Sequence, residues 1–405
     1  MRMSTGRKIL TNNTMTTNGV SFIISARNEY PQVAMTVDNL MMNCYESGIH
    51  DWEVIIADNG STDLTTKFWT HAFANPYAKN ADHQLKGELR YNSRGLVNDG
   101  RLRFTYDPVF SNVGARHKAV KYAKYSKIIF ADAHISLKPG TVKYVLDDLD
   151  EFGGIIHCPV GWMGASVYRP RAGMQYSYKI GEKIWGTWNF AQTTDKGPFY
   201  VPLSGHCFIG VNKDEYMDFG GYDTHQQIYG GGENYLDTLY WLMGSTVMTE
   251  PRGLVFHLSA GRGYSYNMNA LIHNMMLTAY TLGGEKWSER ILLTYLNKPG
   301  TKKDYLYKMY ETALAEGKEK RDMIASRQVR TIDETLGLVG EHDCDGSCRG
   351  EKYRGISSHK KRPWDILNDE KWGNHLSFVQ VFEDWTDRLT DPEAIDFYKN
   401  SPNQK

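Results

Sequence analysis

Cysteine is scarce in this sequence. The five cysteines are scattered along 405 residues, at Cys44, Cys158, Cys207, Cys344 and Cys348. Small secreted domains hold together a minimal core with many closely spaced cysteines, and this spacing does not resemble that pattern. The sequence therefore excludes a secreted disulfide scaffold and favours a reducing, cytoplasmic setting.

Long apolar runs and net charge are also absent. No segment approaches the roughly 18 consecutive apolar residues of a membrane span, and residues 1–18 are polar and lack the apolar stretch of a secretory signal. Because 47 acidic residues balance 47 basic ones, no net charge attracts the chain to nucleic acid or membrane. A local basic patch is still compatible with this balance. We expect no membrane partner and a disordered tail over residues 1–18.

The chain does contain enough apolar residues for a large core, since 41% of its residues are hydrophobic. Its length exceeds that of a typical domain and predicts one catalytic unit with an extension. Short apolar runs alternate with segments in which apolar residues recur at helical spacing. This pattern predicts strands over residues 20–25, 52–57, 102–106 and 127–131 and helices over residues 31–47 and 112–124. This alternation predicts an α/β fold with a mostly parallel sheet and helices on both faces.

The second half of the chain is less regular. We expect residues 201–210 to form a strand that runs into a loop, and residues 246–257 to form one strand with a bend. Helices are expected over residues 212–219, 233–244 and, in charged sequence, 302–335.

One apolar strand ends in Asp132-Ala133-His134. Side chains two residues apart on a strand point to the same side, and a buried carboxylate is costly unless something compensates it. A divalent cation would do so, and a carboxylate with an imidazole suits Mn²⁺ better than Mg²⁺. His257 ends another apolar run and would complete a set of three ligands. The alternative is a helix-capping aspartate beside ordinary core histidines.

Two further segments carry polar groups where ligands bind in such folds, outside the carboxyl ends of the strands. Asp58 follows a buried strand, where it would either cap the next helix or accept hydrogen bonds from a nucleobase or ribose. Glu233 and Asn234 follow three glycines that permit close approach of a ligand. They would bind sugar hydroxyls, or simply begin a helix with an acidic first turn.

These residues resemble a known family. Four motifs resemble the nucleotide-sugar-binding half of the family-2 glycosyltransferases with the GT-A fold. They are residues 25–29 (SARNE), 58–63 (DNGSTD), 112–116 (NVGAR) and 132–134 (DAH). Later motifs resemble the polypeptide N-acetylgalactosaminyltransferase branch, namely residues 185–190, 202–205, 220–223, 229–234 and His257. The resemblance predicts a GT-A domain over residues 19–285 and a mainly helical extension over residues 286–405 as an acceptor-binding region.

The resemblance implies metal-dependent transfer of a GalNAc-, GlcNAc- or Glc-type sugar from a UDP-sugar to a hydroxyl acceptor. Asp58 would bind uridine, and Asp132, His134 and His257 would hold Mn²⁺ (or Mg²⁺) on the diphosphate. Glu233 and Asn234 would be catalytic, beside the donor sugar, and Arg262 would belong to a lid. The full donor-binding set is Ala26, Asn28, Glu29, Asp58, Asn112, Arg116, Asp132, Gly205, Tyr229, Gly232 and Arg262.

The chain also departs from that branch. We expect no membrane anchor and no lectin domain, and Tyr229-Gly230 stands where the branch has tryptophan, so a protein acceptor is not implied. Inverting relatives use an aspartate as base where this chain has Asn234. Because an amide cannot take a proton, we expect retention of configuration, with the leaving phosphate accepting the proton of the acceptor.

One candidate acceptor is a hydroxymethylated pyrimidine in DNA, as modified by phage enzymes, in which case the protein would work in the host cytoplasm. A basic stretch, with Tyr353 and Trp364 near it for stacking, would contact the DNA through Arg349, Lys352, Arg354, Lys360, Lys361 and Arg362. The alternatives are a solvated loop, a protein or glycan acceptor, and an inactive nucleotide-sugar-binding module. A structural zinc site would use His342, Cys344, Cys348 and His359.

Overall fold

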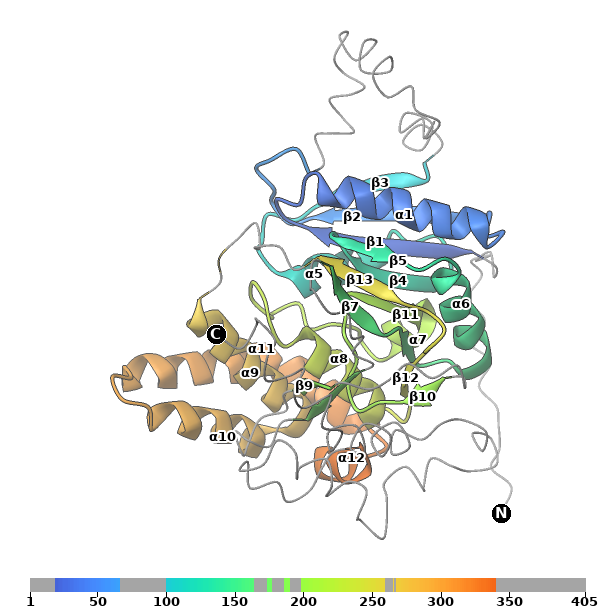
Figure 1. The fold of residues 1–405 in the computed structure, drawn as a ribbon. Helices are drawn as coiled ribbons and strands as arrows, with labels where there is room; N and C mark the ends of the chain where they lie inside the picture. The colour runs from blue at the N-terminus through green and yellow to red at the C-terminus, as the bar shows by residue number, and fades with distance from the viewer. Residues whose placement is uncertain are drawn as a thin grey trace, which may run out of the picture.

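The computed structural model describes residues 19–65, 100–163, 173–176, 186–189, 198–258, 265 and 267–339. Its main sheet has eight strands in the order β10-β12-β6-β11-β4-β1-β2-β3 (Figure 1). The parallel half consists of β3 (Leu102–Tyr106), β2 (Trp52–Asp58), β1 (Val20–Ala26) and β4 (Lys127–Asp132). These strands were predicted, and the α/β class with a mostly parallel sheet is confirmed.

The other half of the main sheet mixes strand directions. It contains β11 (Phe208–Asn212), β6 (Ile155–His157), β12 (Val247–Thr249) and β10 (Phe199–Tyr200). β11 runs antiparallel to both β4 and β6, whereas β12 is parallel to β6 and β10 antiparallel to β12. Because β4 pairs with β1 on one side and β11 on the other, its carboxyl end lies in the middle of the sheet.

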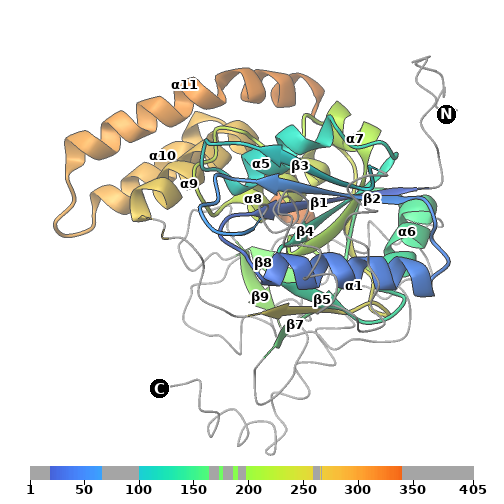
Figure 2. The ribbon, with the colours of Figure 1, turned by 90° about the horizontal axis from the view of Figure 1, so that it is seen from above.

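Helices cover both faces of the main sheet, as predicted. α1 (Gln32–Glu46) and α6 (Thr141–Phe152) lie on one face, and α5 (Asn112–Val120) and α7 (Lys213–Asp218) lie on the other (Figure 2). The strands β1 and β2 are buried along almost their whole length, which explains their continuous apolar sequences. Ser111 caps α5 by accepting a hydrogen bond from Gly114 N at 3.0 Å.

A small second sheet brings His257 towards the carboxyl end of β4. It consists of β5 (Ile135–Leu137), β13 (Val255–Leu258) and β7 (Val160–Met163). In the antiparallel pair of β13 and β5, His257 lies opposite Ile135, the residue after His134. A separate ribbon is formed by β8 (Gly173–Tyr176) and β9 (Gly186–Asn189).

Two predictions for the second half of the chain are wrong. Residues 246–257 form two strands in two sheets, because Glu250 Oε1 accepts a hydrogen bond from Arg252 N at 2.6 Å and turns the chain. In the segment 201–210 the order is reversed: the irregular part comes first and the strand β11 starts at Phe208. Ser204 and His206 bind Asp237 instead of a neighbouring strand. α5 also ends at Val120 rather than near residue 124.

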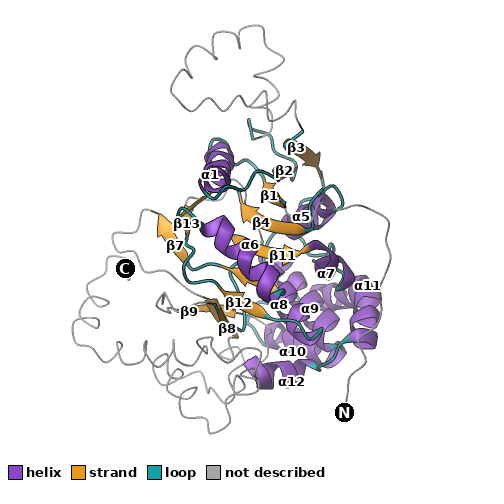
Figure 3. Ribbon diagram, turned by 90° about the vertical axis from the view of Figure 1, so that its right-hand side faces the viewer, coloured by secondary structure: helices purple, strands orange, loops and turns teal. Residues whose placement is uncertain are grey.

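A layer of helices packs beside the sheet (Figures 1 and 3). It contains α8 (Gly232–Leu242), α9 (Met268–Gly283), α10 (Glu285–Leu296), α11 (Lys303–Arg327) and α12 (Ile332–Val339). α9 contacts α8, α10 and α11, so the layer begins before residue 286. The half-buried Lys320 of α11 donates hydrogen bonds to the carbonyls of Gly220 and Tyr222 and thereby attaches α11 to the segment that follows α7. Among the described helices, none combines the length and apolarity of a membrane span.

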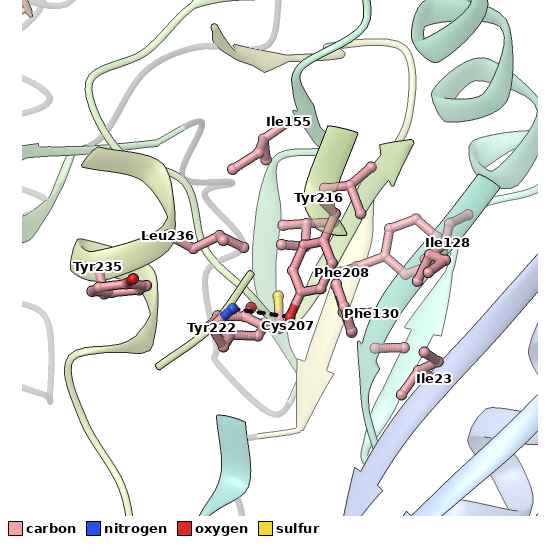
Figure 4. Packing of buried hydrophobic residues seen from close by; sticks show 14 of the residues in the cluster. Ile23, Ile128, Phe130, Ile155, Cys207, Phe208, Tyr216, Tyr222, Tyr235 and Leu236 are labelled. Carbon is pink, nitrogen blue, oxygen red and sulfur yellow. Dashed lines mark hydrogen bonds between the residues drawn. The ribbon is translucent and has the colours of Figure 1, made fainter. Parts of the chain in front are cut away.

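Aromatic rings fill the core between β4, β11 and the loop after α7 (Figure 4). Phe130 packs edge-on against Tyr222 at a centroid distance of 5.4 Å, and Tyr216 contacts both rings. The hydroxyl of Tyr216 accepts a hydrogen bond from Tyr222 N at 3.0 Å. This cluster supports the wall of the site described next, because Tyr222 also lines it.

Candidate active site

Asp132, His134 and His257 meet at the carboxyl end of β4. One ligand atom from each lies within 4.8 Å of the others. His257 Nε2 lies 3.3 Å from Asp132 Oδ2 and 3.2 Å from His134 Nε2, and the two imidazoles stand edge to face. Two nitrogens and a carboxylate oxygen that face one another in this way suit a divalent cation.

Two neighbouring side chains orient these groups. Glu29 Oε2 lies 3.0 Å from His134 Nδ1, and because a carboxylate only accepts, this contact calls for a proton on Nδ1 and directs Nε2 towards His257 and Asp132. Arg116, with a side chain only 2% exposed, lies 2.5 Å from Asp132 Oδ1. The guanidinium also donates to the carbonyls of His206 and Ala131 and to Ser25 Oγ.

These contacts set the protonation of the site. Burial raises the pKa of Asp132, but the hydrogen bond from His257 and the charge of Arg116 outweigh it, so this pKa lies far below its ordinary value. Burial lowers the pKa of His134, whereas the hydrogen bond to Glu29 and the charge of Asp132 raise it, with a net increase. Asp132 is therefore ionised and ready to bind a cation.

A pocket opens beside Asp132. Six residues of the predicted site line it, namely Asn112, Arg116, Asp132, Tyr229, Gly232 and Glu233. Glu233 stands in the first turn of α8, which begins after Gly230 (φ 97°) and Gly231 (φ 94°). Glycine is needed at these two positions because L side chains rarely adopt such φ values. The backbone thus turns sharply and places a carboxylate at the pocket.

Other predicted residues lie around the carboxyl ends of β1 and β2. Asp58 is buried and its Oδ1 accepts a hydrogen bond from Ser61 N at 2.8 Å. Asn28 has a positive φ of 55° and its side chain accepts from Thr62 N at 2.8 Å. Ala26 pairs with Asp58 in the register of β1 and β2, just as Ser25 pairs with Asp132 across β1 and β4. Asp58 and Asp132 thus end the two strands that flank β1.

Gly205 and Asn234 are buried next to the pocket lining. Gly205 precedes the lining residue His206, and Asn234 follows the lining residue Glu233 on α8. Neither is itself a lining residue of this pocket.

The chain is similar to several known proteins. N-acetylgalactosaminyltransferase 4 of Drosophila melanogaster is 24% identical over 195 residues, which are 44% of this chain and 28% of that protein. A probable N-acetylgalactosaminyltransferase 8 of Caenorhabditis elegans is 24% identical over 185 residues, which are 43% of this chain and 44% of that protein. The matched segments thus span less than half of either relative. No known family profile matches the chain.

A solved structure agrees with the fold. The crystal structure of GalNAc-T7 with UDP, GalNAc and Mn²⁺ has a TM-score of 0.54 at 14% identity, covering 80% of this chain and 57% of that one. The chain has the GT-A fold. The predicted fold and the distant similarity to N-acetylgalactosaminyltransferases are therefore confirmed.

The pocket also contains His206 and Gln226, which no sequence motif singled out, and Tyr222, which lies in the motif at residues 220–223 but was not assigned to the site. His206 Nε2 lies 2.8 Å from Asp237 Oδ1, and its Nδ1 lies 2.7 Å from the hydroxyl of Tyr222. His206 and Tyr222 line the pocket, as does Gln226. The sequence offers only a weak indication that His206 belongs to the site, because nothing near it in the sequence shows that it contacts Asp237 on α8.

Several predicted residues lie outside the described part of the chain. These are Arg262 of the expected lid, the zinc candidates His342, Cys344, Cys348 and His359, and the basic stretch from Arg349 to Arg362. The tail over residues 1–18 lies outside it as well. Cys44, Cys158 and Cys207 are buried free thiols.

Proposed function

We propose that this protein is a metal-dependent glycosyltransferase that moves a sugar from a UDP-sugar to a hydroxyl acceptor. The observation that carries the proposal is the convergence of Asp132, His134 and His257 beside a pocket that also contains Glu233. This site lies at the carboxyl edge of a GT-A sheet, where open α/β sheets bind ligands. The similarity to N-acetylgalactosaminyltransferases supports a nucleotide-sugar donor.

The residues fit a Mn²⁺ ion, with Mg²⁺ as the alternative. Two Nε2 atoms and one carboxylate oxygen face one another within 4.8 Å, and Glu29 orients His134 as an outer carboxylate orients many metal-binding histidines. When bound, the ion would neutralise negative charge on the departing diphosphate. Manganese is present in the similar GalNAc-T7 structure.

The donor would lie along the carboxyl ends of β1, β2 and β4. Asp58 at the end of β2 would bind the uridine, with Ala26 and Asn28 beside it, and the diphosphate would reach the trio at the end of β4. Asn112, Tyr229 and Gly232 would then surround the sugar, since they line the pocket next to Asp132. Arg116 would hold Asp132 in place from behind rather than bind the donor, because its guanidinium is occupied by protein acceptors.

The chemistry follows from the residues at the start of α8. Glu233 lines the pocket and would orient the sugar or the acceptor hydroxyl. Asn234 cannot accept a proton, so an inverting reaction lacks a base there, and the acceptor would attack from the face of the leaving phosphate. We expect the product to retain the anomeric configuration. Proton NMR of the new linkage would show this, and an inverted product contradicts it.

The test is UDP release from UDP-GalNAc, UDP-GlcNAc and UDP-Glc in the presence of Mn²⁺. Asp132→Asn and His257→Ala should abolish release, because the first removes the negative charge of a proposed metal ligand and the second removes a proposed ligand altogether. Their matched controls are Asp147→Asn, in an exposed ion pair with Lys143, and His50→Ala, an exposed histidine before the amino end of β2 that is not part of the pocket lining. UDP binding without release from any donor would instead indicate an inactive nucleotide-sugar-binding module.

The acceptor would be bound by the extension over residues 286–405. A hydroxymethylated pyrimidine in DNA is one candidate, supported by the basic stretch around Lys360, Lys361 and Arg362. Binding of such DNA should weaken steeply with salt and be lost when these three residues are neutralised. Absence of binding at low salt would leave a protein or a glycan as the acceptor.

A further inference from the structure

One wall of the pocket is formed by residues 226–230. Within it, Ile228 adopts a φ of 38°, a conformation that β-branched residues rarely adopt and that costs on the order of 1–3 kcal/mol. Backbone of this kind persists only where its surroundings hold it. The contacts that hold Ile228 therefore determine the shape of the pocket.

One side chain of the helical layer binds most of this wall. Asn274, fully buried on α9, donates through Nδ2 to the carbonyls of Gln227 at 2.7 Å, Tyr229 at 3.2 Å and Gly230 at 2.9 Å. Its Oδ1 accepts a hydrogen bond from Gln227 N at 2.7 Å. A single amide thus satisfies backbone groups on both sides of Ile228.

Further contacts hold the two ends of the wall. Gln226 Nε2 donates to Thr278 Oγ1, one turn further along α9, at 2.9 Å. On the sheet side, Ser111 Oγ donates to the Gln226 carbonyl at 2.5 Å, and Ile228 N donates to the Phe110 carbonyl at 2.9 Å. The wall is therefore clamped between α9 and the start of α5.

We propose that Asn274 is a positioning residue for the donor sugar, which holds the strained wall at residues 226–230 in its reactive shape. The inference rests on the proposed function, since it assigns the sugar to this pocket. It also gives the helical layer a role in the reaction: α9 forms the outer support of the active site. Loss of the clamp would let Ile228 relax to an ordinary conformation and move Tyr229 and Glu233.

The main variant is Asn274→Asp, which keeps the size and the Oδ1 acceptor but sets an oxygen against three carbonyl oxygens. The matched control is Thr281→Val on the same helix, a buried residue whose hydroxyl, within the described part of the chain, bonds only to carbonyls of α9 itself. Thr278→Val is a milder variant that removes only the bond to Gln226. Three quantities are measured for each variant. They are the hydrogen exchange of a peptide covering residues 226–232, the affinity for UDP with Mn²⁺, and kcat/KM for UDP release from UDP-GalNAc, UDP-GlcNAc and UDP-Glc.

We expect Asn274→Asp to exchange faster in residues 226–232 and to lose about tenfold to a hundredfold in kcat/KM, because small displacements of positioned groups cost that much. UDP affinity should change little, and Thr278→Val should show a smaller loss. Thr281→Val should match the wild type in all three measurements. Should Asn274→Asp fail to fold, Thr278→Val still decides the outcome.

Unchanged exchange and unchanged kcat/KM in a folded Asn274→Asp, or equal losses in Thr281→Val, would overturn the inference. A wild type that releases no UDP from any of the three donors contradicts the proposed function instead. Hydrogen exchange does not depend on activity, so it tests the clamp in either case.

Discussion

The buried pair of Arg116 and Asp132 offers a quantitative test of how the site is held. Replacing Arg116 by Met keeps most of its volume but removes every donor, which leaves the Asp132 carboxylate without its buried cation. Removing one partner of a buried pair typically costs about 3–5 kcal/mol. Asp132 retains 22% of its side-chain exposure, so solvent offsets part of the loss, and we expect about 3 kcal/mol.

The assay is equilibrium unfolding in urea, and the control is Arg327→Met. Arg327 pairs with Asp218 on the surface, with 38% and 59% of the side chains exposed, and such pairs contribute about 1 kcal/mol or less. The double variant Arg116→Met with Asp132→Asn should be more stable than Arg116→Met alone, because it has no uncompensated carboxylate. If Arg116→Met and Arg327→Met lose the same free energy of unfolding, Arg116 does not hold Asp132 as we infer.

Two further predictions concern stability away from the site. Burial and the neighbouring Glu250 raise the pKa of Asp148 from 3.8 to about 9, so the folded chain keeps a proton that the unfolded chain releases, and the free energy of unfolding falls as the pH rises between those values. Asp148→Asn should remove this fall in urea titrations at pH 5 and 8, and an equal fall in the variant would contradict it. Gly154 and Gly48 have similar φ values, 73° and 67°, but different surroundings. A Cβ added at Gly154 would lie 2.5 Å from the carbonyl oxygen of Thr246, whereas a Cβ added at Gly48 would have no atom within 4 Å. Gly48→Ala should therefore cost about 1–2 kcal/mol for the left-handed backbone alone, and Gly154→Ala about 1–3 kcal/mol more; thermal unfolding showing equal losses would refute the steric argument.

Much of the parallel half of the fold follows from local patterns. The strands β1, β2, β3 and β4 are short apolar runs bounded by polar residues, and parallel strands that alternate with helices align their carboxyl ends. That alignment is why Asp58 and Asp132 come to the same edge. The antiparallel half was harder to predict, because Cys207 and Thr249 belong to runs whose partners are chosen by tertiary pairing rather than by hydrophobic period.

The contacts around the pocket were hard to predict for the same reason, because they too depend on tertiary packing. His206 meets Asp237 across 31 residues, and Gln227 meets Asn274 across 47. In each case an ordinary polar residue on a loop meets another on a helix. No spacing in the sequence distinguishes them from polar residues that face solvent. Only the packing of α8 and α9 against the sheet domain brings them to the pocket.

The meeting of Asp132, His134 and His257, the proposed metal ligands, has a different basis, which lies in how the two sheets are joined. Asp132 ends a strand of the main sheet, whereas His257 belongs to the small sheet, and the two sheets are joined through the short segment that contains His134. Because β5 follows His134 directly and pairs with β13, the register that places His257 opposite Ile135 sets the separation of the two imidazoles. The three proposed ligands thus meet at a junction of two sheets: Asp132 lies in β4, His257 lies in β13, and His134 lies in the segment between β4 and β5. A cation bound there would contact both sheets, so that the same β5–β13 pairing supports the small sheet and completes the site.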